Sequence, residues 1–514
     1  MYLDESIGLD RTIRDPIHED IKMSDEEVEI IDHNLYNRLH HIRQNGLLYL
    51  VFPSSSHTRF EHSLGVLNLT DSIFRSLIRN SQIASNKPTP AVTNKHDAEK
   101  DQAIEFNSLD ECLLSDLLRI SRLSALVHDV GHGPFSHHFD SFAPRVGKIL
   151  QSIDEPECYS PLIEYFTSER EEDERIEHED MSCLMFFRIW QDVARKNNLE
   201  GGSFFDFEAE DIPSLVSAVI LNETSLIPEE QDLRTYVPLL NDLVDSSPAD
   251  ADRMDYLERD SRSAGVTYGF YDQGRLLKSL LVYKGKSQDS GDEFGALRLG
   301  VKKSGLRAAE NFVQARFELF VQIYYHKTNR AVQLMLERIA EIAGAKNISV
   351  DEFYSGSRSV FQLYSDLTDE RFLRILRGDS PMYSLPEDSG QIEKIAERIS
   401  ERDLWKRIYE EDPKTIACMY NALSRNFDKI CMDEISPNAT KGLEDGASLL
   451  IRAESDLYEA VEHTNWLEES AVMRALSEDE RKIARIYFYG SDSDTQDALR
   501  QKARTLAHNP QSCS

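Results

Sequence analysis

The chain has 514 residues, more than one hydrophobic core usually holds, so we expect two or more subdomains. Charged residues make up 29% of the chain and hydrophobic residues 40%, which is typical of a soluble globular protein. The net charge of −33 argues against a surface for long nucleic acid or anionic membrane, because both need an excess of lysine and arginine. A small phosphorylated substrate, held by a few buried cations and a metal ion, stays compatible with this charge.

The sequence lacks an apolar run of about 18 residues, the length that a membrane span needs. Its N-terminus has no basic region followed by an apolar core, so we expect no secretory signal. The six cysteines are scattered and form no Cys-x-x-Cys pair, which favours reduced thiols. We therefore expect a cytoplasmic protein.

The N-terminal segment predicts short elements followed by a long helix. Residues 11–22 alternate apolar and polar positions around a proline, which indicates a short strand or turn. Residues 24–50 are expected to form a helical pair, because a serine followed by three acidic residues starts a helix well. A helix is predicted from Arg59, with His62 in its first turns. Residues 80–111 are polar and show no period, so we expect a surface insertion there.

The densest group of chemically active side chains follows the apolar stretch at residues 112–130, which has helical spacing. This helix delivers His128 and Asp129 and stops at a Gly-x-Gly-Pro break. His132 and His137 follow within a few residues, and packing hardly explains so many imidazoles beside a carboxylate. We interpret the stretch as a metal site with acid–base groups around it, and the neighbouring His138 as structural.

The middle of the chain is predicted to be helical and to carry further polar candidates. An acidic run at residues 167–180 is interpreted as a solvated face, and a helix begins near His178 at its end. Residues 211–262 are expected to be helical. Near the end of this stretch, Asp252 shares one side of the helix with Asp255 or Tyr256 and with Arg259 or Asp260.

In the rest of the chain, the spacing of hydrophobic residues changes twice. Residues 275–303 predict a β-hairpin, and residues 306–343 a long helix that contains Arg316 and Tyr324. Residues 348–514 are highly charged and expected to be helical. We therefore predict a mainly α fold with a small β-hairpin, divided into a core at residues 1–343 and an acidic, helical C-terminal region at residues 344–514.

The chemistry of a metal site restricts what could complete the cluster. A divalent ion needs ligands from several parts of the chain, and His62 and Asp252 are candidates to join His128 and Asp129. Two imidazoles and two carboxylates suit Mg, Mn, Fe or Zn and do not choose among them. Such an ion would activate water and neutralise a phosphate oxygen.

Other residues could act on a phosphate next to this ion. His132, His137 and His178 are spare imidazoles for proton transfer or phosphate contact. Arg59, about one helical turn before His62, is placed for a bidentate phosphate contact.

Each of these residues has a simpler interpretation when it is taken alone. A lone His62 is more often a capping or core histidine, and Asp252 alone is more often a salt-bridge partner on a helix. Tyr324 by itself is more often a core aromatic residue, and Arg316 an ordinary helix-surface charge. The density of imidazoles and carboxylate at residues 128–137 favours function for the group as a whole.

Six sequence segments carry a resemblance to a known family. They are Arg14–His18, Ser56–Val66, His128–His137, His178–Glu179, Ala251–Asp260 and Tyr324–Lys327. In this order they resemble the HD-domain deoxynucleoside triphosphate triphosphohydrolases, most closely the branch of the SAM-and-HD-domain dNTPase. The similarity runs from about residue 11 to residue 330 and includes no SAM domain, and the C-terminal third resembles the family only loosely.

The resemblance implies an HD-domain helical core that cleaves dNTPs to a deoxynucleoside and inorganic triphosphate, by attack at the α-phosphorus. It implies an oligomer, either a dimer or a tetramer, and a nucleotide effector. The implied metal ligands are His62, His128, Asp129 and Asp252. The implied catalytic histidines are His132, His137 and His178. The implied substrate contacts are Gln44, Arg59, Arg253, Tyr256, Asp260, Arg316 and Tyr324, with Gln44 and Asp260 at the 3′-hydroxyl.

The chain departs from the family pattern at several positions. Asn45 stands where the closest branch has a leucine that helps to exclude a 2′-hydroxyl, and Phe320 replaces a pocket histidine. Arg253 stands where the family has lysine, which preserves the charge but not the geometry. Asn37 and His40 replace residues that read an activating guanine nucleotide. The resemblance therefore leaves open both the exclusion of ribonucleotides and the identity of an activator.

Two other functions remain open. A phosphodiesterase, nuclease or nucleotidase of the HD superfamily would keep the metal site and act on another substrate. The acidic composition disfavours long nucleic acid, and Gln44, Tyr256 and Asp260 favour a mononucleotide. A nucleotide-sensing regulator with weak turnover would be expected to lack a ligand or a catalytic histidine, and none is missing from this sequence.

Overall fold

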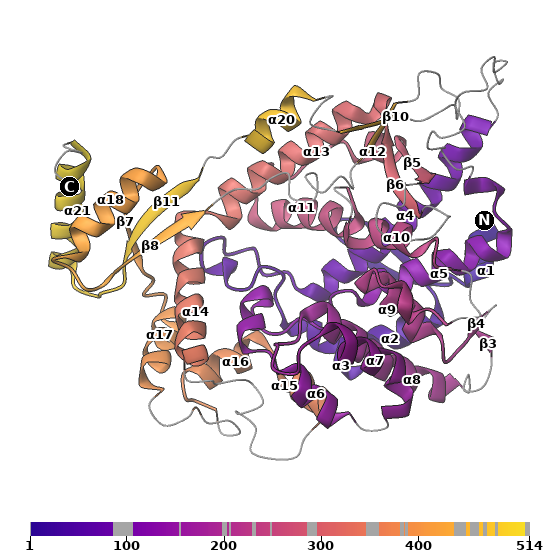
Figure 1. The fold of residues 1–514 in the computed structure, drawn as a ribbon, viewed down its shortest axis with the longest axis horizontal. Helices are drawn as coiled ribbons and strands as arrows, with labels where there is room; N and C mark the ends of the chain where they lie inside the picture. The colour runs from indigo at the N-terminus through magenta and orange to yellow at the C-terminus, as the bar shows by residue number, and fades with distance from the viewer. Residues whose placement is uncertain are drawn as a thin grey trace.

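A computed structural model of the chain is mainly helical with small sheets, as the sequence predicted (Figure 1). The described residues are 2–85, 106–153, 156–197, 203–204, 207–228, 233–246, 249–284, 296–345, 359–380, 385, 389–435, 449–452, 462–465, 470–478 and 482–508. In this part of the chain no helix is both long and apolar enough to cross a membrane.

The helices follow one another along almost the whole chain. They are α1 (Tyr2–Ile7), α2 (Asp25–Asp32), α3 (Asn34–Asn37), α4 (Arg59–Ser85), α5 (Glu111–Val127), α6 (Val146–Ser152), α7 (Ser160–Glu169), α8 (His178–Asn197), α9 (Ile212–Leu221), α10 (Val237–Asn241), α11 (Ala251–Ala264), α12 (Gln273–Leu277), α13 (Leu306–Leu319), α14 (Lys327–Ala345), α15 (Val360–Asp366), α16 (Asp369–Leu376), α17 (Gly390–Ser400), α18 (Pro413–Ser424), α20 (Ala471–Glu478) and α21 (Ser493–His508). Short 3-10 and π turns connect several of them.

The strands form small sheets at the periphery. They are β1 (Arg11–Asp15), β2 (Glu19–Met23), β3 (Ser203–Phe204), β4 (Phe207–Glu208), β5 (Leu280–Lys284), β6 (Leu297–Lys302), β7 (Lys406–Glu411), β8 (Ile430–Ile435), β9 (Leu449–Arg452), β10 (Glu462–Asn465) and β11 (Ile483–Phe488). The strands β1 and β2 pair as a hairpin, and a four-stranded sheet has the order β10-β9-β6-β5.

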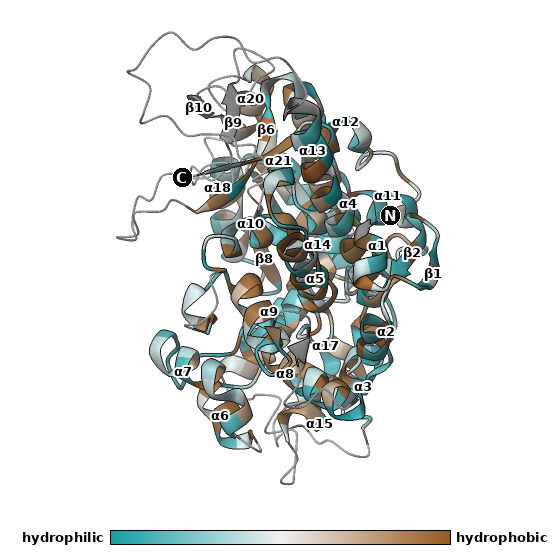
Figure 2. Ribbon diagram, turned by 90° about the vertical axis from the view of Figure 1, so that its right-hand side faces the viewer, coloured by the Kyte–Doolittle hydropathy of each residue, from teal (hydrophilic) through white to brown (hydrophobic). Residues whose placement is uncertain are grey.

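Helix α5 lies at the centre of the core and is buried along most of its length. It packs against α4, α8 and α9, and hydrophobic residues are concentrated where these helices meet (Figure 2). A fully buried arginine, Arg122, joins α5 to two other helices, because its guanidinium lies 2.8 Å from Glu27 Oε1 of α2 and 2.8 Å from Asp71 Oδ1 of α4. A buried charge is tolerated only when it is paired in this way.

Several predicted elements are confirmed. The helix expected from Arg59 is α4, and the helix expected at residues 112–130 is α5. The expected hairpin at residues 275–303 is the antiparallel pair β5–β6, in which Leu280 lies opposite Val301. Of the expected insertion at residues 80–111, residues 86–105 lie outside the described residues, and the flanking residues extend α4 and begin α5.

The predicted long helix at residues 306–343 is wrong in its middle. Helix α13 passes into a π turn at Phe320–Tyr324. The helical conformation is then interrupted until α14 begins at Lys327. Carbonyl groups at the break are bonded by side chains in place of helical N–H groups. The Asn329 amide donates to Tyr324 O over 2.9 Å, and the Arg485 guanidinium donates to Tyr325 O over 2.7 Å. A π turn of this kind is frequent at functional sites.

Two other predicted helical stretches are also interrupted. The second member of the pair expected at residues 24–50 is only the single turn α3, followed by short 3-10 turns. The stretch at residues 211–262 is divided into α9, α10 and α11. Helix α9 ends because Asn222 adopts the left-handed conformation with φ of 52°, which caps the helix.

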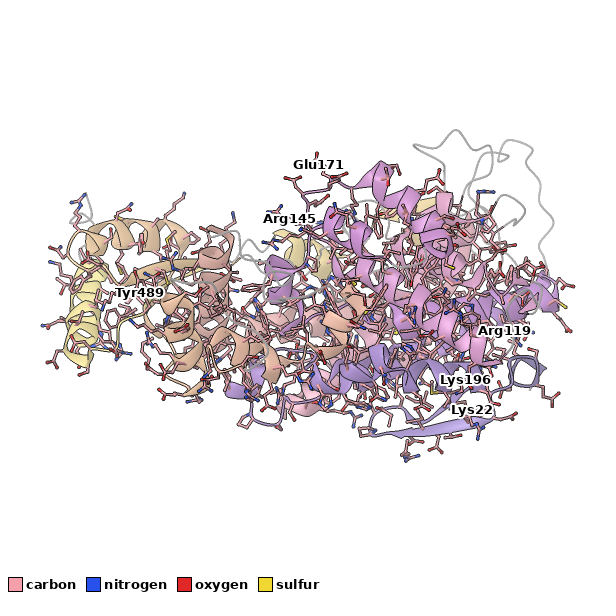
Figure 3. All side chains as sticks on the ribbon, turned by 90° about the horizontal axis from the view of Figure 1, so that it is seen from below. Lys22, Arg119, Arg145, Glu171, Lys196 and Tyr489 are labelled. Atoms are coloured by element: carbon pink, nitrogen blue, oxygen red, sulfur yellow. The ribbon has the colours of Figure 1, made fainter. Side chains whose placement is uncertain are left out.

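The C-terminal region contains strands that the sequence did not predict. Strands β7, β11 and β8 form an antiparallel sheet in that order, and α18 and α21 pack against it around a separate apolar core. These elements form a lobe at the left of Figure 1. In Figure 3, Tyr489 lies in this lobe, and Lys22 and Lys196 lie at the opposite end of the molecule. The expected boundary at residue 344 falls within the last turn of α14, which continues to Ala345. The division of the chain into two domains stays a prediction.

Gly65 in α4 provides a test of this packing. A Cβ atom there would lie 1.9 Å from Asp255 Oδ1 and 2.7 Å from Arg259 Nη2, so a side chain must displace this ion pair. We expect Gly65→Ala to lower the free energy of unfolding by at least about 1–3 kcal/mol in urea denaturation, the usual cost of overpacking.

The matched control is Gly344→Ala at the exposed end of α14, where an added Cβ meets nothing within 4 Å. This substitution should leave stability unchanged or raise it by up to about 1 kcal/mol, because alanine is the better helix former. Equal stability of the two variants would contradict the packing described for α4 and α11.

Candidate active site

Helix α4 carries the first candidate metal ligand, His62, in its first turn. The imidazole is fully buried, and its Nε2 lies 2.9 Å from Asp252 Oδ1 and 3.6 Å from Asp129 Oδ2. Although burial opposes the charged form, Asp252 and Asp255 raise the pKa of His62 to about 10. His62 therefore sits in a strongly negative environment that a cation would also favour.

The end of helix α5 carries the second candidate ligand, His128. Its Nδ1 lies 2.8 Å from Ala125 O, so Nδ1 is the protonated nitrogen and Nε2 is left as an acceptor. That Nε2 is buried, lies 3.5 Å from Asp129 Oδ1, and has no hydrogen-bond partner among the described residues. An imidazole nitrogen held in this tautomer without a donor is suited to a metal ion.

The four predicted ligands come together. Ligand atoms of His62, His128 and Asp252 lie within 4.8 Å of one another, and Asp129 borders the group at the distances given above. Asp252 stands in the first turn of α11, which begins after the N-cap residue Asp250. This donor set of two imidazoles and two carboxylates fits a divalent cation and does not select one.

A buried carboxylate, Asp255, orients the first ligand. Its Oδ2 lies 2.7 Å from His62 Nδ1, while Arg259 donates to both of its oxygens and His18 Nε2 lies 2.6 Å from Oδ1. Burial alone would raise the pKa of Asp255, but Arg259, His18 and His62 hold it well below its usual range. A carboxylate on the far nitrogen of a ligating histidine fixes the ring and strengthens the ligand.

We predicted no role for Asp255 from the sequence, although its spacing gave a signal. Asp255 follows Asp252 by three residues, which places both carboxylates on one side of α11. His18 stands in a segment that carries the family resemblance, but its contact with Asp255, 237 residues away, has no signal in the spacing.

The three predicted catalytic histidines form a second group beside the metal ligands. The rings of His132 and His178 stack with centroids 3.8 Å apart, and His137 meets both edge-on at 5.0 and 5.1 Å. Burial lowers the pKa of His178 to about 4 and, with the help of Arg59, lowers that of His132 well below its usual range. Both imidazoles are therefore neutral at pH 7. The third histidine, His137, is exposed to solvent.

Close backbone approach brings His178 to this position. A Cβ atom on Gly131 would lie 2.2 Å from His178 O and 2.3 Å from Ser182 N, so only glycine allows the turn after α5 to touch the start of α8. The same turn contains Phe135 and Ser136 in left-handed conformations, with φ of 62° and 59°. Residues other than glycine hold such angles only when the surroundings impose them.

Arg59 links the metal ligands to that turn. Its guanidinium forms an ion pair with Asp129 and donates from Nε to Ser136 Oγ over 3.1 Å. Burial would raise the pKa of Asp129, but Arg59 is the main cause that holds it well below its usual range. Asp129 is therefore ionised and available as a ligand.

The candidate ligands Asp129 and Asp252, together with Arg59 and the three histidines, line a cavity of about 430 Å³. Of the predicted substrate contacts, five line it, namely Gln44, Arg59, Tyr256, Asp260 and Tyr324. The lining residues to which the sequence analysis gave no role in the site include Asp245, Tyr325, Asn329, Arg330 and Gln333. The last three lie on α14 just after the helix break, so their arrangement depends on a feature that the sequence pattern did not show.

Two predicted substrate contacts stand apart from the cavity lining. Arg253 forms an ion pair with Asp250 and lies 3.9 Å from Asp245. Arg316 lies behind the wall, where its Nε donates to Tyr256 Oη over 3.2 Å. The structure therefore does not bring Arg253 and Arg316 into direct contact with the cavity.

The fold and the site define a class of protein: a mainly helical core in which histidines and aspartates from three helices form a candidate centre for a divalent cation. Comparison with known proteins agrees with this class. The sequence family described as the HD associated region matches residues 272–508. The protein is homologous to MJ1154 of Methanocaldococcus jannaschii, named as uncharacterised, with 28% identity over 77% of this chain and 59% of the relative.

Other relatives carry a named activity. The deoxynucleoside triphosphate triphosphohydrolase SAMHD1 of Homo sapiens is 26% identical over 78% of this chain and 55% of the relative. A hypothetical protein from Aquifex aeolicus has the same fold in its crystal structure, with a TM-score of 0.61 and 23% identity over 96% of this chain and 99% of that chain. These findings confirm the resemblance to HD-domain dNTP triphosphohydrolases, although the chain spans less than two thirds of the length of MJ1154 and SAMHD1.

The contact between Asp255 and His62 can be tested through metal binding. We expect Asp255→Asn to weaken the affinity for Mn²⁺ about 10–100-fold, because the amide no longer orients and polarises the imidazole. Bound metal is measured by calorimetry and by elemental analysis of the purified protein. Glu258→Gln is the control on the same helix, since Glu258 pairs with Arg262 over 2.6 Å. Equal metal affinity in both variants would show that Asp255 does not support a ligand.

Proposed function

We propose that the protein is a metal-dependent phosphohydrolase that converts dNTPs to a deoxynucleoside and inorganic triphosphate. The observation that carries this proposal is the junction of two groups at one end of a cavity. His62, His128, Asp129 and Asp252 offer metal ligands, and the stacked pair His132 and His178 lies beside them, with both pKa values lowered by burial. The homology to triphosphohydrolases supports the same reaction.

The proposed metal site accounts for the first requirement of the reaction. A divalent cation held by His62, His128, Asp129 and Asp252 would supply charge neutralisation at a phosphate oxygen and activation of water. Asp255 keeps the His62 ring oriented, and Arg59 keeps Asp129 ionised. The chain thus prepares an anionic pocket of fixed geometry before the substrate enters.

The histidine group accounts for the second requirement, which is proton transfer. In the proposed reaction, the oxygen of water bonds to the α-phosphorus and the water loses a proton. The bond from the α-phosphorus to the 5′-oxygen breaks, and the 5′-oxygen gains a proton. Neutral imidazoles donate one N–H and accept at the other nitrogen, so His132 and His178 can both contact phosphate and pass a proton. The stacked rings of these two residues restrict each other's orientation.

The remaining cavity wall fits the organic part of a nucleotide. Tyr256 and Tyr324 present aromatic rings with centroids 6.5 Å apart, and the Tyr324 hydroxyl donates to Asp260. Arg316 touches the Tyr256 hydroxyl and adds positive charge behind the wall. We propose that Tyr256, Asp260 and Tyr324 hold the sugar through polar contacts on an apolar surface, as small-molecule pockets commonly do.

The products of the reaction test this proposal. We expect the purified protein, incubated with Mn²⁺ and each dNTP or pair of nucleotides, to release nucleoside and inorganic triphosphate in ion-exchange chromatography. A chelator should abolish the release, and His132→Ala should lower kcat by about 10²–10⁴-fold, the usual share of a general acid or base. Pairs of nucleotides are included because the resemblance predicts a nucleotide effector.

His33→Gln is the control, because His33 pairs with Asp192 over 3.1 Å at the start of α3 and takes no part in the site. Release of monophosphate or diphosphate would replace the proposal with a phosphodiesterase or nucleotidase. Tight nucleotide binding without turnover in any mixture would indicate a sensing protein instead.

A further inference from the structure

A second cavity lies between helices α7, α8 and α9 and has a volume of about 990 Å³. Its wall comes from these helices and from the short turns at Pro156–Tyr159 and Thr224–Leu226. Helices α8 and α9 pack directly against each other (Figure 1). Among the described residues, this cavity shares no lining residue with the cavity of the candidate active site. Its size is at the upper end of the range that small-molecule sites occupy.

The floor of this second cavity is apolar. Phe187 and Trp190 of α8, together with Leu226 and Ile227 after α9, line it and are buried. The indole N–H of Trp190 already donates to Ala209 O over 2.6 Å, so the ring offers a ligand its apolar surface. A ligand of this cavity therefore needs apolar groups that can contact aliphatic and aromatic side chains.

The rim of the second cavity is acidic. Four carboxylates line it, those of Glu157, Glu164, Glu210 and Asp211, against one cation among the described lining residues, Arg195. The three glutamates are exposed and come from three different segments of the chain. None of these three side chains forms an ion pair with another described residue. Carboxylates that meet around one cavity repel one another, and a positively charged ligand would offset this repulsion.

The lining restricts the charge and the shape of the ligand. Carboxylates only accept hydrogen bonds and repel anions, so the rim disfavours a nucleotide or a phosphate group. A single metal ion needs a tighter group of ligands, because no three of these described carboxylates offer oxygen atoms within 4.8 Å of one another. The ligand that fits carries several separate positive groups, joined by apolar links that contact the floor.

We propose that the second cavity binds an aliphatic polyamine, with its ammonium groups at the glutamates of the rim and its methylene groups on the apolar floor. An ammonium group donates several hydrogen bonds, which suits carboxylates spread around a rim. Tyr165 of α7 lines the same cavity, and the face of its ring attracts an ammonium group. The site lies apart from the candidate metal ligands and does not depend on the proposed function.

Calorimetric titration with spermidine at about 0.15 M salt tests this site, because exposed charges are partly screened under that condition. We expect saturable binding to the wild-type protein. The double variant Glu164→Gln, Glu210→Gln should bind at least about tenfold more weakly, because it removes two charged hydrogen-bond acceptors. Both residues are exposed, so the unfolding temperature without spermidine should stay unchanged.

The matched control is the double variant Glu393→Gln, Glu397→Gln, which changes the net charge equally at exposed positions of α17, at the left of Figure 1. This variant should bind spermidine as the wild-type protein does. Spermidine should also slow hydrogen exchange at residues 157–165 and 187–195 in the wild-type protein.

Three results would overturn the polyamine site. The first is the absence of saturable spermidine binding. The second is an equal loss of affinity in both double variants, which would show a general attraction to an acidic chain. The third is full displacement of spermidine by Mg²⁺ at equal concentration, which would show that charge acts without the apolar floor.

Discussion

The arrangement of the site depends on one buried carboxylate, that of Asp255. It joins the N-terminal hairpin through His18, helix α4 through His62, and its own helix α11 through Arg259. Because an ionised group away from water is costly unless it is fully paired, these three segments can pack together only in the arrangement that supplies all three partners. The position of the candidate ligand His62 therefore follows from the need to pair the buried Asp255 carboxylate.

Distant parts of the chain complete the cavity in the same manner. Asp369 of α16 accepts the backbone N–H groups of Arg43 and Phe135 over 2.9 and 2.8 Å, and so ties together two segments of the cavity wall. On the opposite side, Arg485 of β11 fixes the carbonyl of Tyr325 at the break before α14. Although the candidate metal ligands lie before residue 260, the C-terminal region thus shapes the cavity beside them.

The sequence predicted those features that follow from local pattern. Helices α4 and α5 were predicted from long stretches with apolar residues at helical spacing. The site at residues 128–137 was predicted because packing does not require so many histidines in one short segment. The break at Tyr324–Lys327 did not show, because side chains from Asn329 and the distant Arg485 impose it on a sequence of helical period. The strands of the C-terminal lobe were missed within a charged stretch that was interpreted as helical throughout. The ion pair of Arg253 with Asp250 has the i,i+3 spacing of a helix and could have been predicted from the sequence.

In the proposed function, this site directs water to the α-phosphorus of a nucleoside triphosphate. Hydrolysis in water enriched in the heavy oxygen isotope ¹⁸O tests it most directly, with the products separated and weighed by mass spectrometry. We expect one ¹⁸O atom in the inorganic triphosphate and none in the nucleoside. Label in the nucleoside, which requires attack at carbon, or label in a monophosphate or diphosphate product would contradict it.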